Sequence, residues 1–65
     1  MSLPNAPIER IIRKAGAERV SETAVEELKH AIEEAGEEIA QEAADLAEHA
    51  NRNTVNRKDI EMATR

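Results

Sequence analysis

The chain has no cysteine and no aromatic residue, and these two absences exclude several classes of protein. Without cysteine it can form neither a disulfide framework nor a cysteine zinc site. Without Trp, Tyr or Phe it lacks the large side chains that usually anchor a small core. A chain of 65 residues also buries only about 60% of its unfolded surface. We therefore expect it to be marginal alone and to gain stability by association with another chain.

Long apolar runs and glycine-rich loops are also absent. No apolar stretch approaches the roughly 20 residues that a membrane span requires, and Pro4 and Pro7 stand where a signal peptide needs an apolar run. No phosphate loop, zinc signature or pairing of a nucleophile with a base is present. We therefore predict a soluble intracellular protein that is not an enzyme, with no cofactor, no small-molecule substrate and no membrane partner.

Charge is distributed unevenly along the sequence. Residues 22–50 hold ten of the fourteen acidic residues but only one of the nine Lys and Arg residues, Lys29. The other Lys and Arg residues lie in the two flanking segments, so the net charge of −5 combines two positive ends with a strongly negative middle. Local charge decides which partner is bound. The ends can therefore form a basic edge, while the acids are a solvated face, an adaptation to high salt or a surface that repels a neighbour.

The spacing of apolar residues predicts a short helix near the N-terminus. Pro7 suits its first turn, and Gly16 suits the left-handed position just beyond its end. Its inward face repeats at i, i+3, i+4 and i+7, with Ile8, Ile11, Ile12 and Ala15. The opposite face carries three basic residues.

A long helix of about 30 residues, roughly 45 Å, is predicted next. Ser21 suits its N-cap, and Asn51 suits a left-handed position at its C-terminal end. Gly36 is interpreted as a tolerated interior glycine; the alternative is that it divides the segment into two helices. The apolar face consists of Ala24, Leu28, Ala31, Ile32, Ala35, Ile39, Ala43, Leu46, Ala47 and Ala50.

A second short helix is predicted at the C-terminus. Asn56 begins it, Asp59 completes a capping-box-like pair, and Ile60, Met62 and Ala63 face inward. Two short helices cannot cover the apolar face of the long one, whose centre stays exposed. A second copy crossing there would bury both centres, and a symmetric homodimer is the commonest closed arrangement.

The histidines suggest a metal site that the rest of the sequence does not support. Glu27 and His30 have the Glu-x-x-His spacing of di-iron bundles, but such a site needs a second motif and further inward carboxylates. His30 lies off the apolar face. His49, in the last turn of the long helix, favours the helix dipole or belongs to an interface. We predict no metal and no catalytic residue.

Four stretches, which lie toward the two ends of the chain, resemble archaeal histones, and the resemblance covers essentially the whole chain. They are Leu3–Ile8 (LPxAPI), Arg10–Ser21 (RIIxxAGAERVS), His49–Thr54 (HAxRxT) and Asp59–Ala63 (DIExA), where x marks a position outside the resemblance. The resemblance implies one all-α domain, 1–65, with the histone fold, pairing head to tail in a handshake homodimer. It also implies an architectural protein that binds, wraps and compacts duplex DNA with little sequence preference, in a cytoplasmic, nucleoid-associated location.

The resemblance also implies roles for individual residues. Arg52 and Asp59 match a structural ion pair. Leu46, His49 and Asp59 match the contact by which dimers stack, and Gly16 matches a position where successive DNA turns press together. The residues that match DNA-facing positions are Arg10, Arg13, Arg19, Asn53, Thr54 and Lys58.

Several departures from the family pattern favour a second hypothesis. Asn53 and Asn56 stand where the family usually has Lys, Asn51 stands where it has Gly, and the long helix is more acidic than is typical. Each lost Lys removes a phosphate contact. The alternative is therefore a histone-fold interaction module that pairs with itself or a paralogous histone and has weak or no DNA binding. A metal-binding helical dimer is a remote third.

Overall fold

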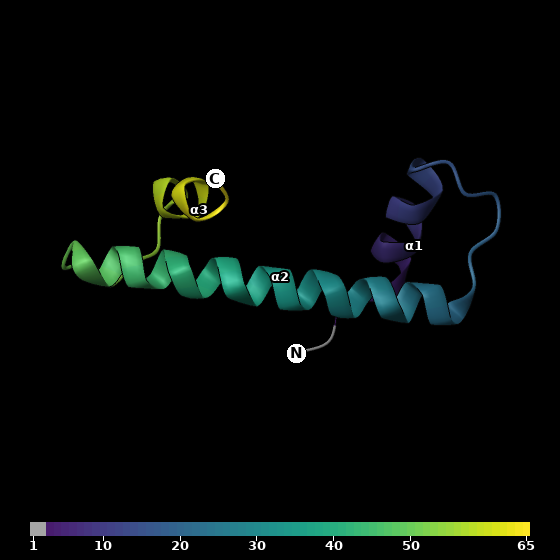
Figure 1. Ribbon diagram of the computed structural model, residues 1–65, viewed down its shortest axis with the longest axis horizontal. Helices are drawn as coiled ribbons and strands as arrows, with labels where there is room; N and C mark the ends of the chain where they lie inside the picture. Colours follow the sequence, from purple (N-terminus) through teal and green to yellow (C-terminus); the bar gives the residue numbers. More distant parts are fainter. Residues whose placement is uncertain (1–2) are drawn as a thin grey trace. The chain divides into compact units, whose positions relative to one another are not determined.

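The computed structural model describes residues 3–65, which contain three helices and no strand. They are α1 (Asn5–Lys14), α2 (Glu22–His49) and α3 (Arg57–Ala63), shown in Figure 1. Contacts divide the chain into two compact units, Met1–Glu33 and Glu34–Arg65, and each unit contains one short helix and one half of α2. Within the described residues, none of the helices combines the length and the apolar character that crossing a bilayer requires.

The end of α1 is formed by a glycine in the left-handed region. Gly16 has a φ of 113°, and its N–H donates to the carbonyl of Arg13 over 3.0 Å. The next N–H, that of Ala17, donates to the carbonyl of Ile12 over 3.4 Å, which completes a Schellman motif. A Cβ at Gly16 would meet nothing within 4 Å. Backbone conformation rather than space in the chain therefore requires this glycine, as the sequence predicted.

Both ends of α2 follow the sequence signals. At the start, Ser21 Oγ accepts a hydrogen bond from the N–H of Ala24 over 3.1 Å, as an N-cap does. At the other end, Asn51 adopts a φ of 59°, and the N–H of Arg52 donates to the carbonyl of Ala47 over 2.9 Å. This is a second Schellman motif. The helix runs unbroken through Gly36, so the alternative of two separate helices is wrong.

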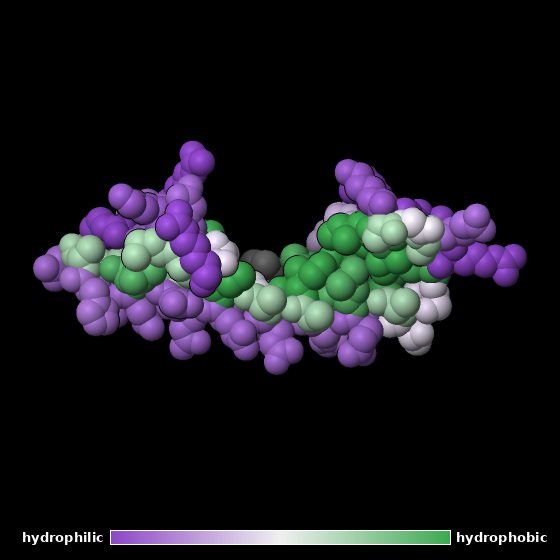
Figure 2. All heavy atoms as spheres, turned by 45° about the horizontal axis from the view of Figure 1, so that its top comes forward, coloured by the Kyte–Doolittle hydropathy of each residue, from purple (hydrophilic) through white to green (hydrophobic). Residues whose placement is uncertain are grey.

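In the first unit, only a narrow strip of α1 is buried. Ile8 and Val25 are 4% and 6% exposed, and Ile12 is half-buried. The prediction that Ile11 and Ala15 face inward is wrong for the single chain, since Ile11 is 50% exposed and Ala15 is exposed too. The physical reason is that two crossing helices meet along one row of side chains, and the adjoining row of α1 is left uncovered. Figure 2 shows apolar side chains on the surface of this unit.

In the second unit, small residues of α2 form the core. Ala43 and Ala47 are 0% and 3% exposed, and α3 lies beside this half of α2 (Figure 1). The predicted inward orientation of Ile60 and Met62 is wrong within the chain, because they are 39% and 52% exposed. The seven-residue α3 instead buries Asp59, whose ion pair sets the rotation of the helix and turns these apolar side chains outward.

The face that α2 buries within its own chain differs from the predicted one. Val25 and Lys29 are buried although neither was assigned to the apolar face, whereas Ala24, Ala31 and Ala35 are exposed. Ile32 and Ile39 are half-buried. The predicted apolar face of α2 is therefore wider than the part that α1 and α3 cover. The middle of α2 retains an apolar surface.

Candidate nucleic-acid interface

The first predicted basic group lies on α1 and the loop that follows it. Arg10 and Arg19 are exposed, and neither forms an ion pair with a residue in 3–65. Arg13 is engaged on two sides, because its Nη2 donates to Glu9 Oε1 over 2.9 Å and its Nη1 donates to the carbonyl of Glu18 over 3.2 Å. Arg13 therefore ties α1 to the loop, and Arg10 and Arg19 are the groups most available to an anion.

The second predicted group lies on the loop between α2 and α3 and at the start of α3. Asn53, Thr54 and Lys58 are all exposed. Behind them, Arg52 Nη1 donates to the carbonyl of Thr54 over 3.1 Å. The loop backbone is therefore fastened from its inner side, while its hydroxyl, amide and ammonium groups face solvent. Each of the two groups is built within its own unit of the chain.

Arg52 and Asp59 form the bidentate ion pair that the resemblance implied. Nη1 donates to Oδ2 and Nη2 to Oδ1, each over 2.8 Å, and Asp59 is 3% exposed. Oδ2 also accepts the N–H of Asn56 over 2.9 Å, while Asn56 Oδ1 accepts the N–H of Asp59 over 3.3 Å. The capping box of α3 and the ion pair thus share one carboxylate.

These contacts change the ionisation of both partners. The hydrogen bonds from Arg52, followed by that from the Asn56 N–H, lower the pKa of Asp59 from 3.8 to about 2. The same hydrogen bonds raise the pKa of Arg52, because they stabilise its charged form. The pair therefore stays charged down to strongly acidic pH.

Lowering the pH is expected to remove the contribution of this pair to stability. The pKa of Asp59 is lower in the folded chain, so its contribution is complete above 3.8 and is lost as the pH falls toward about 2. Asp59→Asn should be less stable than the wild type at neutral pH, and the difference should shrink across that interval. Urea unfolding followed by circular dichroism measures it. A difference in the free energy of unfolding that stays constant down to pH 2 would contradict this role for the carboxylate.

The residues predicted to stack dimers are not gathered into one contact within the chain. Leu46 is half-buried and His49 is exposed, with its Nδ1 2.8 Å from the carbonyl oxygen of Asp45. That nitrogen therefore donates to the backbone and leaves Nε2 for an outside partner. Asp59 already accepts three hydrogen bonds inside its own chain, so a contact with His49 of another dimer would be a fourth.

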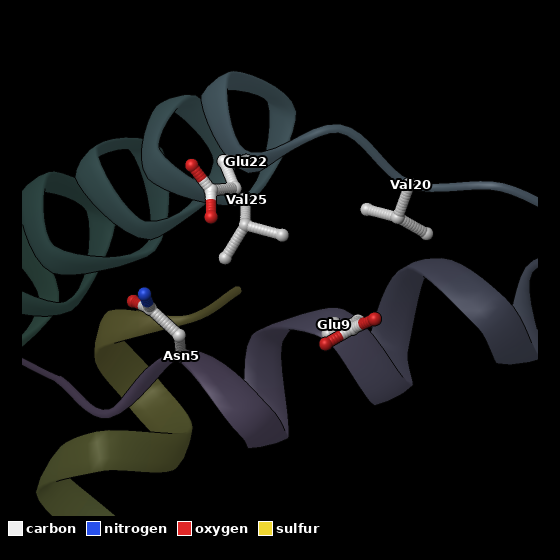
Figure 3. A pocket seen from close by; sticks show the side chains of 5 residues that line it. All are labelled: Asn5, Glu9, Val20, Glu22 and Val25. Atoms are coloured by element: carbon white, nitrogen blue, oxygen red, sulfur yellow. The ribbon is translucent and has the colours of Figure 1, made fainter.

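A pocket of 290 Å³ in the first unit does not suit phosphate. Figure 3 shows its lining, with Glu9 on α1 and Glu22 at the start of α2 bringing two carboxylates to its walls. The complete lining is Asn5, Glu9, Val20, Glu22 and Val25. In the part of the chain that the structure describes, no three His, Asp or Glu side chains are grouped as metal ligands, and this includes Glu27 and His30.

The environment of Lys29 differs from what its charge suggests. From the sequence it was identified only as the single Lys or Arg of the acidic segment, whereas in the structure it is 8% exposed and its Nζ donates to Asn5 Oδ1 over 2.9 Å. The available signal was its position four residues after Val25, which places both side chains on the same face of a helix. Lys29 is therefore part of the interior of the first unit.

Comparison with known proteins places the chain in a family. Residues 1–64 match the model for histone-like transcription factors (CBF/NF-Y) and archaeal histones. The chain is 49% identical over 63 residues to one of the subunits of the archaeal histone HAN1 from Thermococcus zilligii, and the match covers 97% of this chain and 94% of the relative. It is 51% identical over 63 residues, with the same coverage, to probable archaeal histone 3 of Methanocaldococcus jannaschii. Together with the order of a short, a long and a short helix, these matches show that the chain belongs to the archaeal histone family.

Proposed function

We propose that this protein is an architectural DNA-binding protein that acts as a handshake homodimer and wraps and compacts duplex DNA with little sequence preference. The observation that carries the proposal is the exposure of Arg10 and Arg19, without ion pairs among the described residues, on a chain whose net charge is −5. Guanidinium groups that contact phosphates or enter minor grooves bind DNA through its backbone and its deformability, without reading bases.

Exposed apolar side chains support the homodimer. Ile11, Val55, Ile60 and Met62 are 39% to 52% exposed, and the half-buried Ile32 and Ile39 lie in the middle of α2. A chain this small gains stability by covering such side chains with a second copy. Each chain carries one copy of each of the two basic groups, so a dimer would present two copies of each to DNA.

The resemblance to archaeal histones implies individual contacts with DNA, and the exposure of the matching residues supports them. Arg10 and Arg19 would reach phosphates, with Arg19 near a minor groove, and Thr54 would contact phosphate through its hydroxyl and backbone. Asn53 and Lys58 would contact DNA from the loop before α3 and from the first turn of α3. Open space around Gly16 would allow a neighbouring DNA turn to approach closely.

Replacing Arg19 with Ala is expected to weaken binding to duplex DNA about tenfold and to flatten its dependence on salt. Each lost phosphate contact lowers the slope of log K against log salt by about one unit, so a dimer loses about two. Arg57→Ala is the matched control, because it removes the same charge from a 92% exposed side chain that pairs with Glu61 and is outside the predicted edge. Gel-shift titrations of several duplex sequences at two salt concentrations provide the measurement.

The same titrations test the alternative function. A histone-fold interaction module, pairing with itself or with a paralogous histone, is favoured by Asn53, which adds no charge to an exposed loop position. If the wild type fails to bind duplex DNA even at low salt, the architectural proposal is rejected and this alternative is retained. Equal losses for Arg19→Ala and Arg57→Ala would instead show that the basic edge lies elsewhere.

On long DNA, we propose that dimers stack through Leu46, His49 and Asp59. The support is that His49 is exposed and its Nε2 is available for an acidic partner. Chemical crosslinking on long duplexes distinguishes a ladder of higher oligomers from dimers alone, and dimers alone would reject the contact.

A further inference from the structure

Lys29 is the only Lys or Arg in residues 22–50, and it is directed into the chain rather than toward solvent. Its Nζ donates to Asn5 Oδ1 over 2.9 Å and to Glu26 Oε1 over 3.3 Å. A buried ammonium group is tolerated only where hydrogen-bonding partners replace its water. The position of the ammonium is therefore determined by these two side chains, one on its own helix and one on α1.

The contact with Asn5 joins two elements that are distant in sequence. Asn5 is the first residue of α1, and it lies 24 positions before Lys29. The start of α1 has no side-chain cap on Pro4 and no acidic residue in its first turn. A cation is repelled by the positive end of a helix. The contact is thus a directional hydrogen bond to a neutral amide, and it holds the first turn of α1 against α2 by geometry.

The other end of α1 is held separately. Arg13 donates to the carbonyl of Glu18, and Gly16 closes the helix with its Schellman motif. Arg10 lies between these two attachments, whereas Arg19 lies on the loop beyond the second. We expect that loss of the first attachment loosens the start of α1, while the packing of Ile8 and the second attachment remain. Arg10 would then shift more than Arg19, which lies on the loop.

We propose that Lys29 is a positioning residue for DNA binding: through Asn5 it fixes the start of α1 and thereby aims Arg10 at the phosphate backbone. This inference rests on the proposed function. Lys29 would then act in DNA binding although its buried ammonium group contributes little to the exposed charge. Energetic coupling is expected between Asn5 and Arg10, and none between Asn5 and Arg19.

The decisive variant is Asn5→Ala, because it removes the acceptor without changing any charge. We expect it to weaken duplex binding about 3- to 30-fold, the range by which residues that act through others modulate affinity. Gln41→Ala is the matched control, since it also replaces an exposed neutral amide, on the half of α2 that belongs to the second unit. It should leave the affinity unchanged. Lys29→Met should reproduce the loss, and Lys29→Arg, which can still donate to Asn5, should restore most of the affinity.

A double-mutant cycle separates positioning from a general loss of structure. Arg10→Ala should weaken binding less in the Asn5→Ala background than in the wild type, while Arg19→Ala should weaken it equally in both. Equal effects of Arg10→Ala in the two backgrounds would overturn the proposal even though DNA binding itself is intact.

A measurement without DNA keeps the inference testable if the wild type does not bind. Amide hydrogen exchange should be faster across α1 in Asn5→Ala than in the wild type, with α3 unaffected. Unchanged exchange in α1 would show that the hydrogen bond does not hold the helix, and the proposal would fall. Failure of the wild type to bind DNA, in contrast, would reject the proposed function alone and leave Lys29 as an anchor of α1.

Discussion

Ile39→Asp is expected to abolish the folded dimer. Ile39 is half-buried in the single chain and lies in the middle of α2, where the second copy is proposed to cross. The substitution would bury a carboxylate with no cation to pair with, which costs several kcal/mol, a large fraction of the stability of any small protein. Because Ile8 is the only Ile, Leu or Met that the single chain buries among residues 3–65, we expect loss of the dimer to unfold the helices as well.

Sedimentation velocity and circular dichroism measure the two consequences separately. Gln41→Asp is the matched control, since it introduces the same charge two positions further along α2, at an exposed residue. It should remain a folded dimer. A helical, folded monomer of Ile39→Asp at micromolar concentration would show that the single chain is stable alone, and the proposed requirement for a second copy would be wrong.

Salt is expected to change stability and DNA binding in opposite directions. Of the acidic residues on α2, only Glu26 takes part in an ion pair within residues 3–65. The others repel along the helix, and like charges at i, i+4 cost a few tenths of a kcal/mol per pair. Raising the salt from about 0.1 M to 1 M shortens the Debye length from about 10 Å to 3 Å and screens this repulsion. The melting temperature should therefore rise.

Over a similar range the affinity for DNA should collapse. If a dimer contacts about six phosphates, counterion release predicts a loss of about 10³-fold between roughly 50 mM and 200 mM salt. Thermal melts and binding titrations in the same KCl series measure both trends. A melting temperature that falls with added salt would show that the acidic residues on α2 are stabilised by attraction to cationic groups. An affinity for DNA that does not change with salt would reject phosphate binding by the basic edge.

The elements of the fold were predictable because their signals are local. Gly16, Ser21 and Asn51 each act on the few backbone groups beside them, so their effect can be read without knowing the tertiary structure. The unbroken α2 was equally predictable, since the apolar pattern keeps its phase across Gly36.

The orientation of side chains was harder to predict than the helices that carry them. Ile11, Ile60 and Met62 were expected to face inward, yet they are exposed in the single chain. Apolar periodicity predicts which face of a helix is buried. It does not show whether that face is buried by the same chain or by a second copy. The position of Lys29 relative to Val25 indicated a shared helix face, but its hydrogen bond was not predictable, because Asn5 lies too far away in sequence to be identified as the partner.

The hydrogen bonds of Arg52 affect the entropy of binding, because they order the loop before α3. Its guanidinium holds Asp59 with one edge and reaches the carbonyl of Thr54, so the loop before α3 is ordered by the chain itself. A loop that is already ordered loses little conformational freedom when it meets a ligand, whereas long exposed side chains such as that of Arg10 must be immobilised on contact. The two parts of the proposed edge should therefore differ thermodynamically, with the Thr54 loop acting as a rigid template and the arginine side chains carrying most of the ordering cost.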